Sequence, residues 1–322
     1  MKIFLTGAAG FIGAKTSEFL LQSGYSVFGV DNLNDYYDIS IKKYRLENLK
    51  KHSSFIFDKC DIENIDEIDK ILKEDKFDAI INLAARAGVR YSLVDPHVYA
   101  RTNAHGTLNL LELMRKHNIP KLITASTSSL YAGQEMPFSE DLPVNEPLSP
   151  YAASKKASEM YGYSYHHLYG LDVCVLRYFT VYGPAGRPDM SYFRFIKWID
   201  EGTPLELFGD GNQSRDFTFI DDIAAGTIKS LKTTGFNIIN LGGGNNPQSI
   251  NYMIELIEKN LGKKATIDYK PFHRADMMTT WADISRAKKI LDWQPSVTLE
   301  EGIAQCVDWY KDNYSWIKNI SL

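Results

Sequence analysis

A glycine-rich turn between a strand and a helix is the feature that most restricts how this chain can fold. An apolar run at 3–6 leads into the spacing G-x-x-G-x-x-G, and a helical pattern over Phe11–Gln22 follows. The first glycine permits a tight turn, the second lets the backbone approach a pyrophosphate, and the third lets the helix pack closely on the strand. The helix N-terminus supplies N–H donors and a positive dipole end. The pattern predicts a phosphate-binding turn made by Gly7, Gly10, Phe11, Ile12 and Gly13.

Short apolar runs alternate with helical patterns over the first half of the chain. Strands are expected at 3–6, 26–30, 54–57, 79–83, 122–126 and 173–177, and helices at 11–22, 65–73, 98–116 and 151–169. This alternation predicts right-handed β-α-β units, and therefore an α/β fold of the Rossmann type, with a doubly wound parallel sheet covered on both faces.

The pattern changes beyond residue 179. Glycine and proline become frequent and the alternation is lost, with one late strand expected at 236–241 and a final helix at 299–314. We expect an NAD-binding Rossmann domain at 1–178 that takes back part of 217–244. A second, smaller lobe of mixed α/β structure, formed mainly by 179–322, is expected to bind the substrate.

Composition disfavours several classes of protein. The 322 residues carry 36 basic and 40 acidic side chains, so no charge excess favours nucleic acid or an anionic membrane as a partner. No run approaches the ~18 apolar residues of a membrane span, and the chain enters strand-like sequence at once, without a secretory signal. The three scattered cysteines indicate reduced thiols and a cytoplasmic location. We expect no metal site, because the adjacent His166 and His167 diverge by about 100° on a helix.

Carboxylates at the ends of the second and third strands are candidate contacts for a dinucleotide. Asp31 ends the second strand 18 residues after the last glycine of the turn, close to the interval of ~20 residues at which a carboxylate binds a ribose diol. Because this charge would repel a 2′-phosphate, the sequence favours NAD over NADP. A capping role is the alternative for Asp31. Asn32 is a further candidate, and Asp61 and Ile62 after the third strand could face the adenine.

A tyrosine and a lysine one helical turn apart form the candidate catalytic pair. Tyr151 and Lys155 open the helix at 151–169, and their spacing places the phenol and the ammonium on one face. A tyrosine ionises near pH 10, and we expect the Lys155 cation and a positive nicotinamide to bring that pKa toward neutrality. Tyr151 is then a general base for a hydroxyl, and Lys155 a donor to the nicotinamide ribose. The hydroxyl side chains of residues 126–129, at the end of the fifth expected strand, could act with this pair. The alternative to a catalytic pair is that the Tyr-x-x-x-Lys spacing is accidental.

Taken together, these segments resemble the extended short-chain dehydrogenases/reductases, and among them the NAD-dependent nucleotide-sugar 4-epimerases. The resemblance covers almost the whole chain and includes 82–85, 103–107 and 209–217. The stretches 31–38, 87–92 and 177–190 are similar to those of UDP-glucuronate 4-epimerases. The resemblance implies NAD as cofactor, a UDP-sugar as substrate and inversion at C4 through a 4-keto sugar. It also implies a homodimer built on the helices 98–116 and 151–169, which from the sequence alone could equally be internal core.

The same resemblance assigns roles to individual residues. The implied catalytic residues are Tyr151, Lys155 and Thr127. Cofactor contacts added to those above are Leu83, Ala84, Ala85, Asn103 and Lys155. The implied substrate contacts are Arg90, Ser126, Ser128, Tyr151, Thr180, Arg187, Arg215 and Thr280. Thr180 and Arg187 match residues that face a sugar carboxylate, and Arg215 matches a pyrophosphate contact. A planar guanidinium can bond both carboxylate oxygens; a salt bridge is the alternative for Arg187.

Departures from the family pattern decide between related reactions. The 4,6-dehydratases carry Asp-Glu after the catalytic threonine and the decarboxylases carry Glu at the second of these positions, whereas this chain has Ser128 and Ser129. Dehydration and decarboxylation are therefore disfavoured. Thr280 stands where hexose epimerases have Tyr, and this smaller side chain would admit an N-acetyl group. UDP-N-acetylglucosamine or UDP-glucose 4-epimerisation is thus the alternative, and a non-catalytic NAD-binding regulator is a distant one.

Two further departures affect the loops around the substrate. Uronate epimerases usually have Trp where Ala185 stands, inside the loop that carries Arg187. Hexose epimerases place a phosphate-binding Arg where this chain has His273, while Arg274 is one position away. Which of these two side chains contacts the diphosphate is left open.

Overall fold

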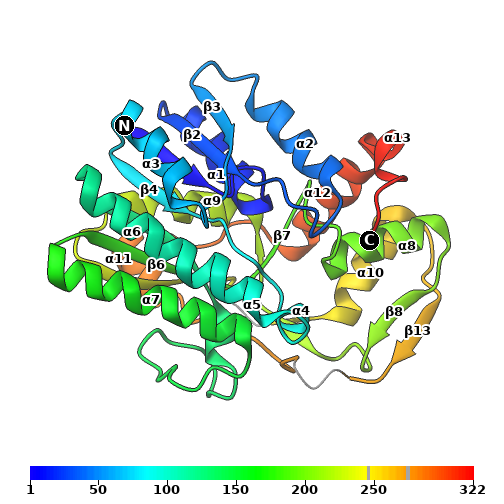
Figure 1. Ribbon diagram of the computed structural model, residues 1–322. Coiled ribbons are helices and arrows are strands. Elements are labelled where there is room, and N and C mark those ends of the chain that lie inside the picture. The colour runs from blue at the N-terminus through cyan, green and yellow to red at the C-terminus, as the bar shows by residue number, and fades with distance from the viewer. Residues whose placement is uncertain (245–246, 273–275) are drawn as a thin grey trace.

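The computed structural model describes residues 1–244, 247–272 and 276–322, and a seven-stranded parallel sheet forms its centre (Figure 1). The strand order is β11-β6-β5-β4-β1-β2-β3. The order reverses between β1 and β4, and ligands of such sheets bind outside the carboxyl ends of the strands at that point. The strands are β1 (Lys2–Thr6), β2 (Ser26–Asp31), β3 (Phe55–Lys59), β4 (Ala79–Asn82), β5 (Lys121–Thr127), β6 (Asp172–Tyr178) and β11 (Phe236–Leu241).

Helices cover both faces of this sheet, which confirms the predicted doubly wound α/β fold. One hydrophobic cluster joins the sheet to the apolar sides of α3 (Ile65–Glu74), α6 (Gly106–His117) and α7 (Pro150–Tyr169). A second cluster on the opposite face includes α1 (Phe11–Gln22) and α9 (Ile220–Lys229). Figure 1 shows α6 and α7 side by side in front of the sheet and α9 behind it.

The second half of the chain contributes to the large sheet and builds smaller ones. Strand β11 pairs in parallel with β6, so the chain returns to the large sheet after residue 230. Helix α11 (Ser285–Leu291) packs against β11 and α9, whereas α8 (Ser191–Glu201), α10 (Ile250–Leu261), α12 (Leu299–Asp312) and α13 (Tyr314–Ile317) lie beyond the large sheet. Three two-stranded sheets complete this part: β7 (Thr180–Tyr182) with β10 (Phe217–Phe219), β8 (Leu205–Phe208) with β13 (Ile267–Lys270), and β9 (Ser214–Arg215) with β12 (Gln248–Ser249).

Two helical segments differ from the sequence prediction. The helix expected at 98–116 is divided into α5 (Pro96–Tyr99), a π-helical turn η1 (Ala100–His105) and α6. The sequence analysis did not predict α2 (Ile39–Leu49), because two of its buried positions, Lys42 and Arg45, are cationic and obscure the apolar period. Helix α2 follows β2 directly and lies beside α1 (Figure 1).

Two class-level predictions can be compared with the described residues. Within 1–244, 247–272 and 276–322, no helix is long and apolar enough to cross a membrane. The same residues contain no group of three or more His, Cys, Asp or Glu side chains placed to hold a metal ion.

Candidate active site

The glycine-rich turn has the close backbone contacts that exclude side chains. Gly7 has a φ of 73°, and a Cβ atom there would lie 2.7 Å from the Ala84 nitrogen. A Cβ atom on Gly13 would lie 2.0 Å from the Gly7 carbonyl oxygen. Gly10 is the N-cap of α1, and among the described residues no side chain caps this helix. A compact cradle with an uncapped helix N-terminus fits a dinucleotide pyrophosphate.

Asp31 lies at the carboxyl end of β2, beside this turn. Its carboxylate accepts hydrogen bonds from the Ala9 nitrogen at 3.2 Å and the Leu33 nitrogen at 2.8 Å. The Nδ2 atom of Asn32 donates to Oδ2 of Asp61 at 2.7 Å, which joins the ends of β2 and β3. A buried carboxylate held next to a phosphate turn fits the ribose diol of NAD.

Residues 83–86, which follow β4, pass close to the glycine-rich turn and are held by hydrogen bonds with β1 and with Asn103. The Ala84 nitrogen donates to Oγ1 of Thr6 at 3.1 Å. The buried Asn103 accepts from the Arg86 nitrogen at 2.8 Å, and its Nδ2 atom donates to the Arg86 carbonyl at 3.0 Å and to Ser154 Oγ at 2.9 Å. The amide of Asn103 is thus used within the protein. The structure gives it a supporting position beside Arg86, and its contact with the cofactor stays a prediction.

Ile62 also differs from its predicted surroundings. Its side chain is buried in the hydrophobic cluster between the sheet and α3 and α6. A Cβ atom on Gly106 would lie 2.6 Å from Ile62 Cδ1, so this side chain packs against the start of α6. Only the backbone of Ile62 is left to face an adenine.

Three predicted catalytic residues meet at the carboxyl end of β5. Ser149 caps α7 by accepting from the Ala152 nitrogen at 3.2 Å, and this fixes the first turn that carries Tyr151. Tyr151 is hydrogen-bonded to the side chain of Thr127, the last residue of β5. The buried Lys155 donates from Nζ to the Ala125 carbonyl at 2.9 Å. The phenol, the hydroxyl and the ammonium therefore share one end of one strand.

The charges around the pair differ from the sequence prediction. Burial raises the pKa of Tyr151, and the hydrogen bond with Thr127 and the charge of Arg187 oppose this rise. Burial lowers the pKa of Lys155 to about 8, against the opposing charge of Glu159. The sequence pointed to Lys155 as the cation acting on Tyr151. In the structure the charge of Arg187 also opposes the rise in the pKa of Tyr151, while Lys155 directs its ammonium to the Ala125 carbonyl.

Ser126 faces the protein interior. Its hydroxyl donates to Oε1 of Glu159 at 2.6 Å. The hydroxyl thus supports Glu159 in this structure, and its contact with a substrate stays a prediction. Ser128 begins the 3-10 turn η2 (Ser128–Tyr131) just beyond Thr127. Glu159 was not among the predicted residues, although it follows Lys155 by one helical turn and that spacing could have indicated it.

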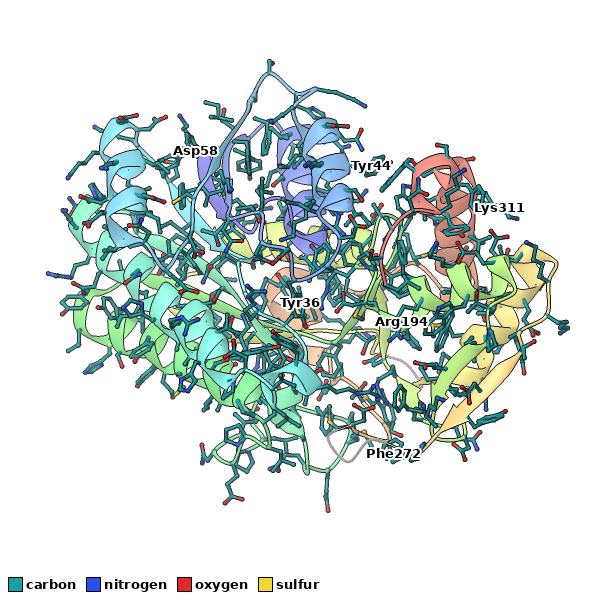
Figure 2. The ribbon with its side chains drawn as sticks, turned by 45° about the vertical axis from the view of Figure 1, so that its right-hand side comes forward. Tyr36, Tyr44, Asp58, Arg194, Phe272 and Lys311 are labelled. Carbon is teal, nitrogen blue, oxygen red and sulfur yellow. The ribbon has the colours of Figure 1, made fainter. Side chains whose placement is uncertain are left out.

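The predicted carboxylate contacts, Thr180 and Arg187, belong to β7 and the loop that follows it. Nε of Arg187 donates to Oδ1 of Asp189 at 3.0 Å, and Nη2 donates to Oδ2. The guanidinium also lies 5.7 Å from the ring centroid of Tyr36. Tyr36 lies near the middle of the molecule (Figure 2), and Thr180 begins the nearby strand β7. Arg187 thus makes an ion pair within its own loop, and a substrate carboxylate would exchange with Asp189.

Arg215, the predicted pyrophosphate contact, and Arg90, a predicted substrate contact, both lie near Asp276. Arg90 pairs with Asp276 at 2.6 Å, and its guanidinium lies 4.2 Å from the ring centroid of Phe208. Arg215 donates from Nη1 to the carbonyls of Ser214 and Met278. Burial, aided by the charge of Arg90, lowers the pKa of Arg215, while Asp276 opposes the shift. Two cations beside one carboxylate fit a dianionic diphosphate. His273 and Arg274 lie outside the described residues.

The family of the chain follows from comparison with known proteins. Residues 4–306 match the family described as GDP-mannose 4,6 dehydratase. The chain belongs to this family. The family is part of the extended short-chain dehydrogenases/reductases, as the glycine turn and the Tyr151–Lys155 pair indicated.

Individual members of the family agree with this chain over nearly their full length. UDP-glucuronate 4-epimerase of Thermodesulfobacterium geofontis is 59% identical over 318 residues, which are 99% of this chain and 98% of that protein. The crystal structure of UDP-glucuronic acid 4-epimerase from Bacillus cereus with UDP-glucuronic acid and NAD is 40% identical, with a TM-score of 0.91 and coverage of 97% and 99%. The UDP-glucose 4-epimerase of Thermotoga maritima is 31% identical, with a TM-score of 0.88 and coverage of 98% and 100%.

One residue expected to distinguish substrates within this family is buried. Thr280 has an exposed fraction of 2%, and its Oγ1 atom accepts from the Asp216 nitrogen at 3.3 Å. The expectation that a threonine here opens room for an N-acetyl group therefore finds no support in its surroundings.

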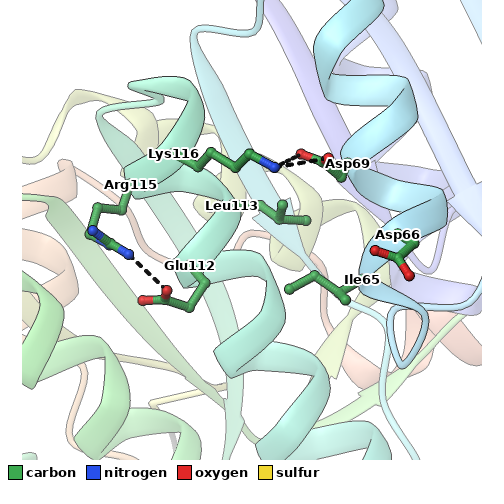
Figure 3. A pocket seen from close by; sticks show the side chains of 7 residues that line it. All are labelled: Ile65, Asp66, Asp69, Glu112, Leu113, Arg115 and Lys116. Atoms are coloured by element: carbon green, nitrogen blue, oxygen red, sulfur yellow. Dashed lines mark hydrogen bonds and ion pairs between the residues drawn. The ribbon is translucent and has the colours of Figure 1, made fainter.

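A surface hollow of about 280 Å³ lies away from these residues, between α3 and α6 (Figure 3). In it Lys116 pairs with Asp69 at 2.9 Å and Arg115 pairs with Glu112 at 2.9 Å. These four charges are paired within the hollow, and none of its lining side chains is a predicted site residue. The residues predicted to bind the cofactor and to act in catalysis gather instead at the carboxyl ends of β1, β2, β4 and β5.

Proposed function

We propose that this protein is an NAD-dependent UDP-sugar 4-epimerase that interconverts UDP-glucuronate and UDP-galacturonate. The observation that carries the proposal is the meeting of Tyr151, Thr127 and Lys155 at the end of β5, with Arg187 as the nearby cation. The 59% identity to a UDP-glucuronate 4-epimerase supports the same reaction and substrate.

The dinucleotide is held by the residues that surround the first turn. Gly7, Gly10 and Gly13 leave room for the pyrophosphate, and the N–H groups of the first turn of α1 bind it. Asp31 accepts from the ribose hydroxyls. When bound, NAD⁺ would supply the acceptor for the hydride that leaves C4 of the sugar, and a positive charge beside the phenol of Tyr151.

Tyr151 removes the proton of the sugar 4-hydroxyl as C4 is oxidised. Thr127 is hydrogen-bonded to Tyr151, so it can share that proton and keep the phenol oriented. The ammonium of Lys155 lies one turn along α7 and stabilises the phenolate form as a nearby positive charge. The 4-keto sugar then turns about its diphosphate linkage, and Tyr151 returns the proton after hydride arrives on the opposite face.

The residues after 179 bind the substrate in this proposal. Arg187 and Thr180 bind the sugar carboxylate, and a planar guanidinium can bond both of its oxygens. Arg90 and Arg215 bind the diphosphate. Ser128 and Ser129 stand where the dehydratases carry Asp-Glu and the decarboxylases carry Glu, so the 4-keto sugar is expected to keep its carboxylate and to be reduced again.

The alternatives are less well supported. An N-acetylhexosamine substrate was the alternative suggested by Thr280, whose hydroxyl is bonded to the Asp216 backbone. A non-catalytic NAD-binding regulator does not need Tyr151, Lys155 and Thr127 gathered at one strand end.

The proposal extends to assembly and location. Several apolar side chains on the outer side of α7 are exposed: Met160 by 41%, Tyr163 by 51%, Leu168 by 64% and Tyr169 by 49%. Exposed apolar groups on one helix are typical of an interface between subunits, and a homodimer through α6 and α7 would cover them. The three cysteines are free and buried, which agrees with a cytoplasmic location.

Product analysis tests the function directly. The purified protein is incubated without added cofactor with UDP-glucuronate, UDP-N-acetylglucosamine or UDP-glucose, and the products are identified by NMR. We expect UDP-galacturonate from UDP-glucuronate and much slower conversion of the other two. Conversion of UDP-N-acetylglucosamine at an equal or higher rate would contradict the proposed substrate, and no inversion of any UDP-sugar would contradict the reaction.

A further inference from the structure

One buried guanidinium connects the dinucleotide turn with the substrate loop. Arg45 on α2 has an exposed fraction of 4%. Its Nη1 atom donates to the Ala9 carbonyl at 3.0 Å, inside the glycine-rich turn. On the other side, Nε and Nη2 donate to the Ala185 carbonyl at 2.9 and 2.7 Å, and Nη2 also donates to the Gly186 carbonyl at 2.9 Å. The side chain therefore spans two segments that are more than 170 residues apart in sequence.

The loop that Arg45 binds is held in an unusual backbone conformation. Ala185 has a φ of 53°, in the left-handed region that non-glycine residues seldom adopt. At Gly186 a Cβ atom would lie 1.6 Å from the Tyr192 hydroxyl, so the chain passes tightly over α8. Such conformations persist only when their surroundings impose them. The five hydrogen bonds of Arg45, one of them to the Tyr37 hydroxyl, are such surroundings.

The next residue in this loop is Arg187, the candidate contact for the sugar carboxylate. We propose that Arg45 is a positioning residue for uronate recognition: it fixes residues 185–186 against the dinucleotide turn and thereby directs Arg187 to the sugar. This inference rests on the proposed function. Lysine cannot replace Arg45, because a single ammonium lacks the planar fork that reaches Ala9 and Ala185 together.

Two substitutions and one control separate positioning from general stability. R45M keeps the apolar stem and removes every donor, and R45K keeps the charge without the fork. L46A, at the next residue of α2, truncates a buried apolar side chain and weakens the same helix without touching either loop. Each protein is assayed for kcat and KM with UDP-glucuronate, for binding of UDP alone, and for amide exchange over 183–190.

We expect both Arg45 variants to raise KM for UDP-glucuronate at least about tenfold, since misplacement by ~1 Å can cost as much as 10²-fold. Binding of UDP alone, which lacks the carboxylate, is expected to stay within about twofold of the original protein. Amide exchange over 183–190 becomes faster in R45M and R45K and remains unchanged in L46A.

Two results would overturn the inference. One is an R45M protein whose KM for UDP-glucuronate and exchange over 183–190 equal those of the unmodified protein. The other is an L46A protein that reproduces both changes, because the effect would then come from destabilising α2. Failure of the proposed function has a different signature: the unmodified protein would not convert UDP-glucuronate, while the exchange measurement would still report whether Arg45 holds the loop.

Discussion

Arg177 and Glu159 form a two-pronged ion pair directly beneath the catalytic end of β5. Nε and Nη2 of Arg177 lie 2.9 and 2.7 Å from the two carboxylate oxygens, and the exposed fractions of the residues are 1% and 0%. Oε1 of Glu159 also accepts from Ser126, and Nη1 of Arg177 donates to the Tyr131 hydroxyl at 2.8 Å. A fully bonded pair of buried charges thus supports the strand end that carries Thr127.

Removing one member of this ion pair should lower the free energy of unfolding far more than replacing both members with apolar side chains. R177M leaves the Glu159 carboxylate buried without its partner, and we expect the free energy of unfolding to fall by about 3–5 kcal/mol. The double variant E159L/R177M removes both charges and should recover most of that loss. Chemical denaturation of the three proteins measures both values. A single variant that loses less than about 1 kcal/mol would mean that water or another side chain compensates the carboxylate.

Tyr151→Phe removes the group that exchanges the proton with the sugar. Because one general acid–base group contributes about 10²–10⁴-fold, kcat should fall at least about 10²-fold, while NAD stays bound and UDP-glucuronate still binds. Turnover by NMR and the absorbance of the released dinucleotide measure these quantities. Near-normal turnover in this variant would show that another group carries the proton.

Arg187→Ala should distinguish substrates by charge. Loss of a charged hydrogen-bonding partner costs about 2–5 kcal/mol, so kcat/KM for UDP-glucuronate should fall at least about 30-fold. The slow reaction with UDP-glucose, which has no carboxylate, should fall by a much smaller factor, because it loses only the effect of Arg187 on the pKa of Tyr151. Asp189→Asn is the matched control: it frees the guanidinium from its ion pair, and KM for UDP-glucuronate should be lowered or unchanged. Equal losses with both sugars in R187A would remove the carboxylate assignment.

The fold could be predicted largely from local patterns. The glycine turn, the run of strands and the helix 11–22 depend on neighbours in sequence, and the structure has each of them within two residues. Helix α2 was missed because Lys42 and Arg45 are buried for reasons of tertiary contact: one bonds Asn34 and the other bonds Ala9 and Ala185. A pattern of apolar residues cannot indicate a helix whose buried face is partly cationic.

The site could be predicted as a set of segments, but not as a set of contacts. Tyr151 and Lys155 were found because one helical turn separates them. The orientations of Ser126 and Asn103 depend on partners 33 and 51 residues away, Glu159 and Ser154. Sequence spacing does not indicate whether such a side chain points to the ligand or to the protein interior. The ion pair between Arg187 and Asp189 likewise depends on the conformation of their loop.

The low pKa of Lys155 should limit activity in alkaline solution. Burial lowers this pKa from 10.5 to about 8, so the ammonium that supports the Tyr151 phenolate is lost as the pH rises through about 8. We expect kcat to fall above that pH. Stability should change in the opposite sense: between about pH 8 and 10.5 the unfolded chain binds the proton that the folded chain has lost, so this group makes folding more favourable as the pH rises. Values of kcat measured from pH 6 to 10, with recovery of activity checked at pH 7.5, test the predicted loss of activity. A flat profile of kcat up to pH 9.5 would contradict it.

Ala185 lies beside a surface groove of about 320 Å³ that a larger side chain could fill. Phe11, Tyr44 and Trp309 also line this groove, and uronate epimerases that the chain resembles usually carry Trp at position 185. The hydrogen bonds of Arg45 go to the backbone carbonyl of this residue, so they survive a change of side chain. Ala185→Trp should therefore add apolar contact and raise the free energy of unfolding by about 0.5–2 kcal/mol, as cavity-filling changes do.

The matched control for this substitution is Ala185→Ser, which keeps a side chain in the same left-handed conformation and fills nothing. Thermal unfolding should place A185W about 1–4 °C above A185S, given that a protein of this size gains roughly 2 °C per kcal/mol. If A185W unfolds at or below the temperature of A185S, the groove is not a packing defect. The tryptophan would then be excluded by the tight path of the chain between Arg45 and Tyr192, and the alanine would be required by that path.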